Sequence, residues 1–264
     1  MHAFRPWPHL VIDPAGPNSP LILGVVFSLL IAALVTNAVL KNRGAYRRFA
    51  KLHSSRLRRR TMRKWLISSV ALLGGSALVT SLLGWRYVPL LLADIDAIPF
   101  VAGARKLFDA GGWLSWGILI ALVVIIVVGG TVALFMVRND QEIITVGDIQ
   151  AILPRNRREL PYGAALSINA GISEEMLFRF AMPALIFAFT GNALLAVIVS
   201  VLIFGALHAY QGVAGVVGTT IIGALFMAIY LATGNIFVVI IVHALVDLRS
   251  LVLIPMVINR VHRT

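Results

Sequence analysis

Long apolar segments alternate with short polar ones along most of this chain. Each apolar segment has about 20 residues or more, which is the length that an α-helix needs to cross the hydrocarbon core of a bilayer. The pattern predicts seven membrane-spanning helices, over residues 20–40, 65–84, 113–137, 161–190, 193–210, 212–233 and 236–258. An eighth helix results if residues 161–190 form two segments.

The polar segments are interpreted as connections between the spans. Residues 85–112 carry charges of both signs and are predicted to be a loop, and residues 138–160 are expected to lie along the membrane surface. No polar segment is large enough to fold alone. The prediction is therefore an all-α fold, a polytopic transmembrane bundle of about seven to eight helices in a single membrane domain, 1–264.

The composition agrees with a membrane protein. Hydrophobic residues make up 59% of the 264 residues and the mean hydropathy is +0.91, whereas soluble domains are about 45–50% apolar. There is no Cys, which excludes disulfides, thiolate metal ligands and a cysteine nucleophile.

The net charge of +12 is concentrated in one segment. Eleven Lys and Arg residues and no acid lie between Lys41 and Lys64, directly between two predicted spans. A nucleic-acid-binding arm would explain the charge, but no such motif is present. A cytoplasmic loop that obeys the positive-inside rule, in contact with anionic lipid, explains it better. With this loop inside, seven spans place the N-terminus outside and the C-terminus in the cytoplasm.

Ionisable residues interrupt the last spans, where a charge costs at least ~2.5–3.5 kcal/mol. Glu175 and Arg179 are four residues apart, so on a helix they share a face and can form an ion pair. Glu174 points about 100° away on a helix of about 3.6 residues per turn and needs another partner. A purely structural pair with a protonated Glu174 is one interpretation. A functional site is the other, since intramembrane charges are usually functional.

Three further polar side chains lie on two later spans. His208 lies at the end of span 193–210, and His243 and Asp247 are four residues apart in the last span. Each of them taken alone has a structural explanation, such as an Asp that orients a His. Taken with Glu174, they form a set that would prefer a shared wet cavity to lipid. A Glu and a His can activate water as a general base, and His can stabilise an oxyanion.

The order and spacing of these residues resemble the CPBP family, which comprises CAAX prenyl proteases and bacteriocin-processing (Abi) enzymes. The family pattern is EExxxR, then FxxxH, then HxxxN or HxxxD. The corresponding residues here are Glu174, Glu175 and Arg179, then Phe204 and His208, then His243 and Asp247. The resemblance covers about 150–250, the expected catalytic core, and residues 1–140 carry no recognised motif.

The resemblance implies an intramembrane endopeptidase of about eight helices. Glu174 would activate water with help from His208, Glu175 and Arg179 would form an ion pair that shapes the site, and His243 with Asp247 would hold the oxyanion. Zinc bound by Glu174, His208 and His243 is the competing mechanism. No cofactor is favoured.

Two functional classes follow from these observations. The favoured one is an endopeptidase in the plasma (inner) membrane that cleaves membrane-tethered or lipidated peptides in contact with membrane lipid. The alternative is a non-catalytic scaffold or proton-coupled carrier of the same fold, since a proton relay uses the same residue types. No nucleic-acid partner is expected.

Overall fold

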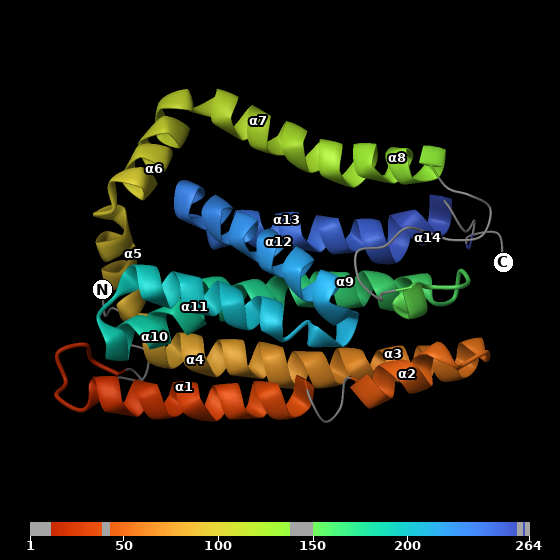
Figure 1. The fold of residues 1–264 in the computed structure, drawn as a ribbon, viewed down its shortest axis with the longest axis horizontal. Helices are drawn as coiled ribbons and strands as arrows, with labels where there is room; N and C mark the ends of the chain where they lie inside the picture. The colour runs from red at the N-terminus through yellow and green to blue at the C-terminus, as the bar shows by residue number, and fades with distance from the viewer. Residues whose placement is uncertain (1–11, 39–42, 138–149, 258–260, 262–264) are drawn as a thin grey trace, which may run out of the picture.

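The structure is a computed structural model, and it describes residues 12–38, 43–137, 150–257 and 261. The described residues form helices and connecting turns, with no strand among them, which confirms the predicted all-α class. The long helices run roughly alongside one another, with α1 at one edge and α7–α8 at the other, while α5 and α6 close one end (Figure 1).

The helices follow the chain in order. They are α1 (Ser19–Thr36), α2 (Arg43–Ala50), α3 (Ser55–Ser69), α4 (Gly75–Gly84), α5 (Tyr87–Asp96), α6 (Pro99–Gly111), α7 (Trp113–Val124), α8 (Gly130–Val137), α9 (Leu160–Glu175), α10 (Met182–Thr190), α11 (Ala193–Ala206), α12 (Gly212–Thr233), α13 (Ile236–Leu248) and α14 (Ile254–Val257). Four π-helical segments, η2 (Val70–Gly74), η3 (Ile125–Gly129), η5 (Met176–Ala181) and η7 (Arg249–Leu253), join consecutive helices without a break, and two short 3₁₀ turns are η4 (Gln150–Ile152) and η6 (Ala209–Gln211).

Among the described residues, five helices are long and apolar enough to cross a membrane, or six if one bent pair counts as a span. The five are Ser19–Thr36, Ser55–Gly84, Trp113–Val132, Ala209–Thr233 and Ile236–Val257, each of which overlaps a predicted span. The other two predicted spans are also helical. However, α9, η5 and α10 carry three charged residues, and α11 has only 14 residues. The chain is therefore a multi-pass membrane protein with fewer spans of ordinary composition than predicted.

The prediction of a loop over residues 85–112 is wrong. This segment forms α5 and α6, which meet at an angle of 95°. The polar side chains have partners in the bundle: Asp94 accepts a hydrogen bond from the backbone of Ala193, and Arg105 donates to the backbone oxygen of Leu231 and pairs with Asp96. The charged residues that suggest a loop in the sequence thus bind the bent α5–α6 pair to the start of α11 and the end of α12.

Small residues let α9 and α13 approach each other closely. Gly163, Ser167 and Gly171 are buried along one face of α9. A Cβ atom added at Gly171 would lie 2.9 Å from the backbone oxygen of Ile240 and 3.0 Å from the Ala244 side chain. Because small residues are what allow helices to pack backbone to backbone in membranes, this stripe fixes how far the residues that follow Gly171 lie from α13.

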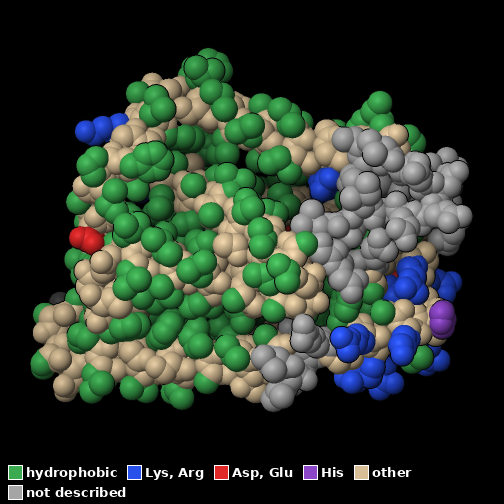
Figure 2. Space-filling model, in the orientation of Figure 1, with side chains coloured by type: hydrophobic (Ala, Val, Ile, Leu, Met, Phe, Trp, Pro, Cys, Tyr) green, Lys and Arg blue, Asp and Glu red, His purple; other side chains and the backbone are tan. Residues whose placement is uncertain are grey.

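The basic segment 41–64 is not uniformly exposed, as a solvated loop would be. Its described part forms α2 and the start of α3, and Lys and Arg side chains gather at that end of the molecule (Figure 2). Arg58 is an exception, because it is only 1% exposed, stacks 4.2 Å over the Phe49 ring and pairs with buried Glu159 at 3.0 Å.

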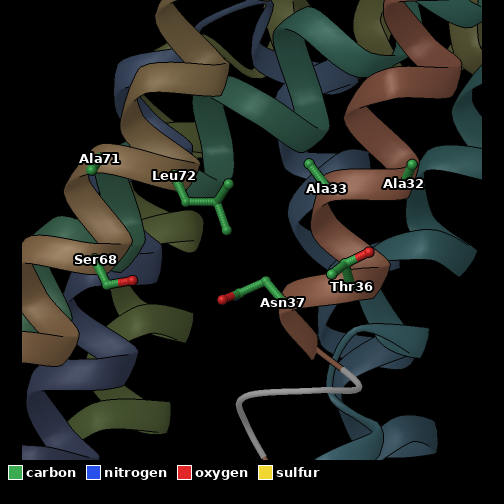
Figure 3. A pocket seen from close by; sticks show the side chains of 7 residues that line it. All are labelled: Ala32, Ala33, Thr36, Asn37, Ser68, Ala71 and Leu72. Carbon is green, nitrogen blue, oxygen red and sulfur yellow. The ribbon is translucent and has the colours of Figure 1, made fainter.

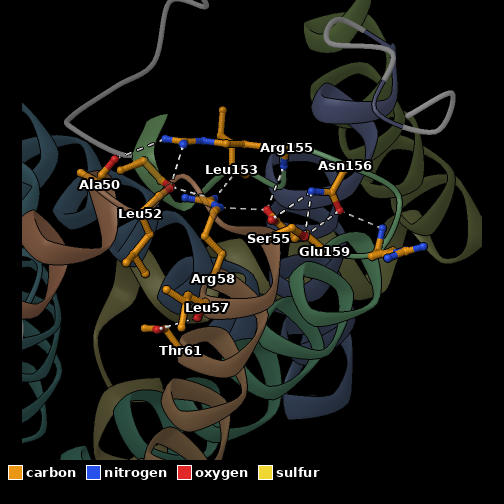
Figure 4. A network of polar contacts seen from close by, with 12 residues as sticks. Ala50, Leu52, Ser55, Leu57, Arg58, Thr61, Leu153, Arg155, Asn156 and Glu159 are labelled. Carbon is orange, nitrogen blue, oxygen red and sulfur yellow. Dashed lines mark hydrogen bonds and ion pairs between the residues drawn. The ribbon is translucent and has the colours of Figure 1, made fainter.

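A polar network surrounds this buried pair (Figure 4). Arg58 also donates to the backbone oxygens of Ala151 and Leu153. Glu159 accepts hydrogen bonds from the backbone N–H of Arg155 and from the side chain of Asn156. The described part of the predicted surface segment 138–160, from residue 150 on, is thus anchored to α3, while residues 138–149 lie outside the described residues.

Candidate active site

Glu175 is the centre of the polar cluster and is fully buried. Its Oε1 lies 2.5 Å from Nδ1 of His243, and its Oε2 lies 3.0 Å from Nε of Arg179. The Arg179 contact is the one that the four-residue spacing predicts. The His243 contact joins α9 to α13, and it depends on the close approach that Gly171 permits.

Arg179 lies in η5 and is 1% exposed. Its Nη2 donates to the backbone oxygen of Gly223 at 3.2 Å, and its guanidinium stacks 4.4 Å from the centroid of Phe204. Its Nε faces Glu175 Oε2 without the alignment of a hydrogen bond, so charge and the aromatic face stabilise the cation. A cation–π contact of this kind contributes about 0.5–2 kcal/mol.

Glu174 and Asp247 lie on the other side of the His243 ring. His243 Nε2 is 4.0 Å from Glu174 Oε2 and 3.7 Å from Asp247 Oδ2. The Glu174 and Asp247 side chains are 17% and 34% exposed, whereas Glu175 is inaccessible. Separations of this size exceed a direct hydrogen bond and leave room for a bridging water or a substrate atom.

The His243 ring has a carboxylate near each of its two nitrogens. The acceptor that fixes the His243 ring is Glu175, at Nδ1, and Asp247 instead approaches Nε2. The sequence did not indicate this arrangement, because Glu175 and His243 are 68 residues apart. Glu175 therefore has two partners, Arg179 and His243, where the spacing predicts one.

His208 follows the end of α11, beside this cluster. Its Nδ1 lies 2.8 Å from the backbone oxygen of Phe204, so Nδ1–H donates and Nε2 is left as an acceptor. Its ring lies 4.9 Å from Phe204, whose ring is 6.4 Å from that of His243. Among the described residues, no hydrogen bond or ion pair links His208 to Glu174. Any help that His208 gives to Glu174 therefore acts across a gap.

Two aromatic residues of the site carry no polar signal in the sequence. Phe226 of α12 lies 5.0 Å from the His243 ring, and Tyr210 lies 6.0 Å from the His208 ring. Phe226 looks like an ordinary core residue of an apolar span. Tyr210 adjoins His208 in the chain, and its hydroxyl accepts a hydrogen bond from the Gln211 side chain.

The donor atoms do not fit a metal ion. Zinc needs ligand atoms about 2.0–2.2 Å from a shared centre. Within the described ranges, no group of three or more His, Asp or Glu residues is arranged to hold an ion. The steps derived below therefore use side chains and water.

The fold and this cluster together define a multi-pass helical membrane protein with a buried carboxylate–histidine centre. Residues 156–249 match the family described as Type II CAAX prenyl endopeptidase Rce1-like. The match spans less than half of the chain and includes every candidate site residue. It confirms the resemblance that the motifs predict and supports an intramembrane protease activity. No curated protein and no solved structure matches this chain.

Proposed function

We propose that this protein is an intramembrane endopeptidase that hydrolyses a peptide bond of a membrane-tethered or lipidated substrate. The observation that carries the proposal is the setting of His243. One ring nitrogen is fixed by buried Glu175, and the other faces the partly exposed carboxylates of Glu174 and Asp247 at 4.0 and 3.7 Å. A fixed imidazole beside an accessible carboxylate is the pairing that general acid–base hydrolysis requires.

Glu174 is the proposed base. It takes a proton from a water molecule while the water oxygen bonds to the carbonyl carbon of the substrate. The Glu174 carboxyl then gives this proton to the leaving nitrogen as the C–N bond breaks. One water is consumed, and the products are a carboxylic acid and an amine. His208, whose Nε2 lone pair is free, assists the same water.

His243 is the proposed oxyanion donor. Because Nδ1–H donates to Glu175, the Nε2 atom donates only when the ring carries a second proton. The proposed mechanism requires this second proton, and three carboxylates, Glu174, Glu175 and Asp247, face the ring. A donor aimed at the developing oxyanion typically contributes ~10²–10³ in rate. Asp247 contributes by stabilising the cation.

The test is cleavage of a membrane-tethered peptide by purified protein in lipid vesicles. Glu174→Gln keeps the shape but removes the base, so activity should fall by about 10²–10⁴. Asp109→Asn, which alters an exposed acid on α6, is the matched control and should be fully active. Full activity of Glu174→Gln would show that Glu174 is not the base, whereas absence of cleavage by the wild type would support the non-catalytic scaffold or carrier instead.

We further propose that the basic end of the bundle faces the cytoplasm and that Glu174 is reached from that side. The supporting observation is the concentration of Lys and Arg over α2 and α3 (Figure 2). The chain has no Cys, so single-Cys variants can be labelled with an impermeant maleimide. Lys51→Cys and Glu174→Cys should react from the cytoplasmic face and Asp109→Cys from the other. Labelling of Glu174→Cys together with Asp109→Cys contradicts this orientation.

A further inference from the structure

A groove separates α1 from the continuous helix α3–η2 on the surface of the bundle. It holds a cavity of about 560 Å³, and Leu72 and Asn37 point into the space between the two helices (Figure 3). Small side chains, Ala32 and Ala33 on α1 and Ala71 on η2, line its walls. Since these alanines do not fill the space, the groove stays open beside helices that span the membrane.

A second cavity of about 500 Å³ adjoins the first one. The two share Asn37, Ser68 and Leu72 in their walls, so they form one continuous groove. The second cavity is lined by Arg48 and Lys64 as well as by aromatic residues. Neither cation has an ion-pair partner in the part of the chain that the structure describes, and no Asp or Glu lines either cavity.

The groove therefore changes in character along its length. One end is lined mostly by alanine and leucine carbon atoms within the span, and the other is cationic at the basic end of the bundle. A ligand that satisfies both ends has a hydrocarbon chain joined to an anionic head. A free phosphate ion would leave the apolar end unused, and a neutral lipid would leave both cations without a partner.

We propose that this groove binds an anionic phospholipid taken from the surrounding membrane. One acyl chain lies between α1 and η2 against Ala33 and Ala71, and the phosphate lies between Arg48 and Lys64. Basic pockets between transmembrane helices are a common site for such headgroups. Trp65 lines the cationic cavity, and it provides a reporter beside the bound lipid.

The test measures quenching of Trp65 fluorescence by lipids with brominated acyl chains. Trp7, Trp85, Trp113 and Trp116 are replaced by Phe, and the protein is placed in nanodiscs of phosphatidylcholine. Brominated phosphatidylglycerol should quench Trp65 far more than the same fraction of brominated phosphatidylcholine. Equal quenching by the two lipids overturns the proposal.

Charge-matched variants separate the groove from general attraction to an anionic leaflet. Arg48→Gln with Lys64→Gln should weaken the preference for phosphatidylglycerol about thirtyfold, because each cation contributes roughly 1 kcal/mol and a tenfold change is about 1.4 kcal/mol. Arg47→Gln with Arg63→Gln removes the same charge from exposed neighbours that do not line the groove and should leave the preference unchanged. Equal losses in the two double variants contradict a defined site.

A second pair of variants tests whether the acyl chain lies in the groove. Ala33→Phe fills the apolar end and should lower quenching by brominated phosphatidylglycerol. Val35→Phe places the same aromatic side chain on an exposed residue of α1 that does not line the cavity and should have no effect. Unchanged quenching in Ala33→Phe would show that the chain does not occupy the groove.

Discussion

Replacement of Glu175 by Gln tests whether the charge of Glu175 stabilises the buried cluster. The side chain keeps its size and an oxygen that accepts from His243 Nδ1, but it loses its charge. Arg179 is then a buried cation that retains its hydrogen bond to the Gly223 backbone and the faces of Phe204 and Phe226. No other carboxylate pairs with Arg179 among the described residues.

The expected loss of stability follows from the contacts that Arg179 keeps after the substitution. Loss of one partner from a buried ion pair costs about 3–5 kcal/mol, because the other charge stays desolvated. The remaining cation–π contact contributes about 0.5–2 kcal/mol and does not compensate. Glu174→Gln should cost about 1 kcal/mol or less, since that side chain is partly exposed and makes no close ion pair.

The assay is equilibrium unfolding in mixed micelles by titration with a denaturing detergent, for wild type and both single variants. A third variant, Glu175→Gln with Arg179→Met, removes the unpaired cation and should recover most of the lost free energy of unfolding, since apolar replacement of a whole buried pair is often neutral. Cleavage activity should be low in Glu174→Gln despite its normal stability.

Two results would refute this reasoning. If Glu175→Gln were as stable as Glu174→Gln, Arg179 would have another source of stabilisation. If the double variant were no more stable than Glu175→Gln alone, the cost would come from lost packing rather than from an unpaired charge.

Three further changes have definite expected outcomes. Asp247→Asn should retain much of the cleavage activity, because the Asn amide can itself donate a hydrogen bond to the oxyanion, which an ionised carboxylate cannot; stoichiometric zinc with zinc-restored cleavage would contradict this. Arg58→Met should lower the free energy of unfolding by about 3 kcal/mol, as it leaves a buried carboxylate without its cation, whereas exposed Arg60→Met should change it by less than ~0.5 kcal/mol. Gly171→Ala should lower the free energy of unfolding by about 1–3 kcal/mol, because the added Cβ meets the α13 backbone. Gly103→Ala on α6, where a Cβ has open space, should raise it by ~0.5–1 kcal/mol. Detergent unfolding measures the last two, and equal values within either pair would contradict them.

The spans were predictable because length and hydrophobicity are local properties of the chain. The α5–α6 pair was not, because its charges look like those of a loop. Arg105 is satisfied by the backbone of Leu231, 126 residues away, and only the folded bundle supplies that partner. The same holds for Arg58, which looks like every other residue of the basic segment until its contact with Glu159 is known.

The candidate site, like the fold, was only partly predictable from the sequence. The contact between Glu175 and Arg179 follows from the geometry of a single helix. The contact between Glu175 and His243 depends on how α9 crosses α13, and that crossing depends on a glycine stripe without any chemical signature of its own. Motif order points to the residues that the structure brings together, but it does not tell which carboxylate contacts His243 Nδ1.

Exposure separates the roles of the carboxylates. Glu175 is 0% exposed and lies between a cation and an imidazole, so it is poorly placed to meet a substrate. Glu174, its neighbour in the chain, is 17% exposed because it points about 100° away on the same helix. A water molecule therefore reaches Glu174 and not Glu175. In the proposed mechanism, the two adjacent glutamates therefore have different roles: buried Glu175 fixes His243, and accessible Glu174 is the base.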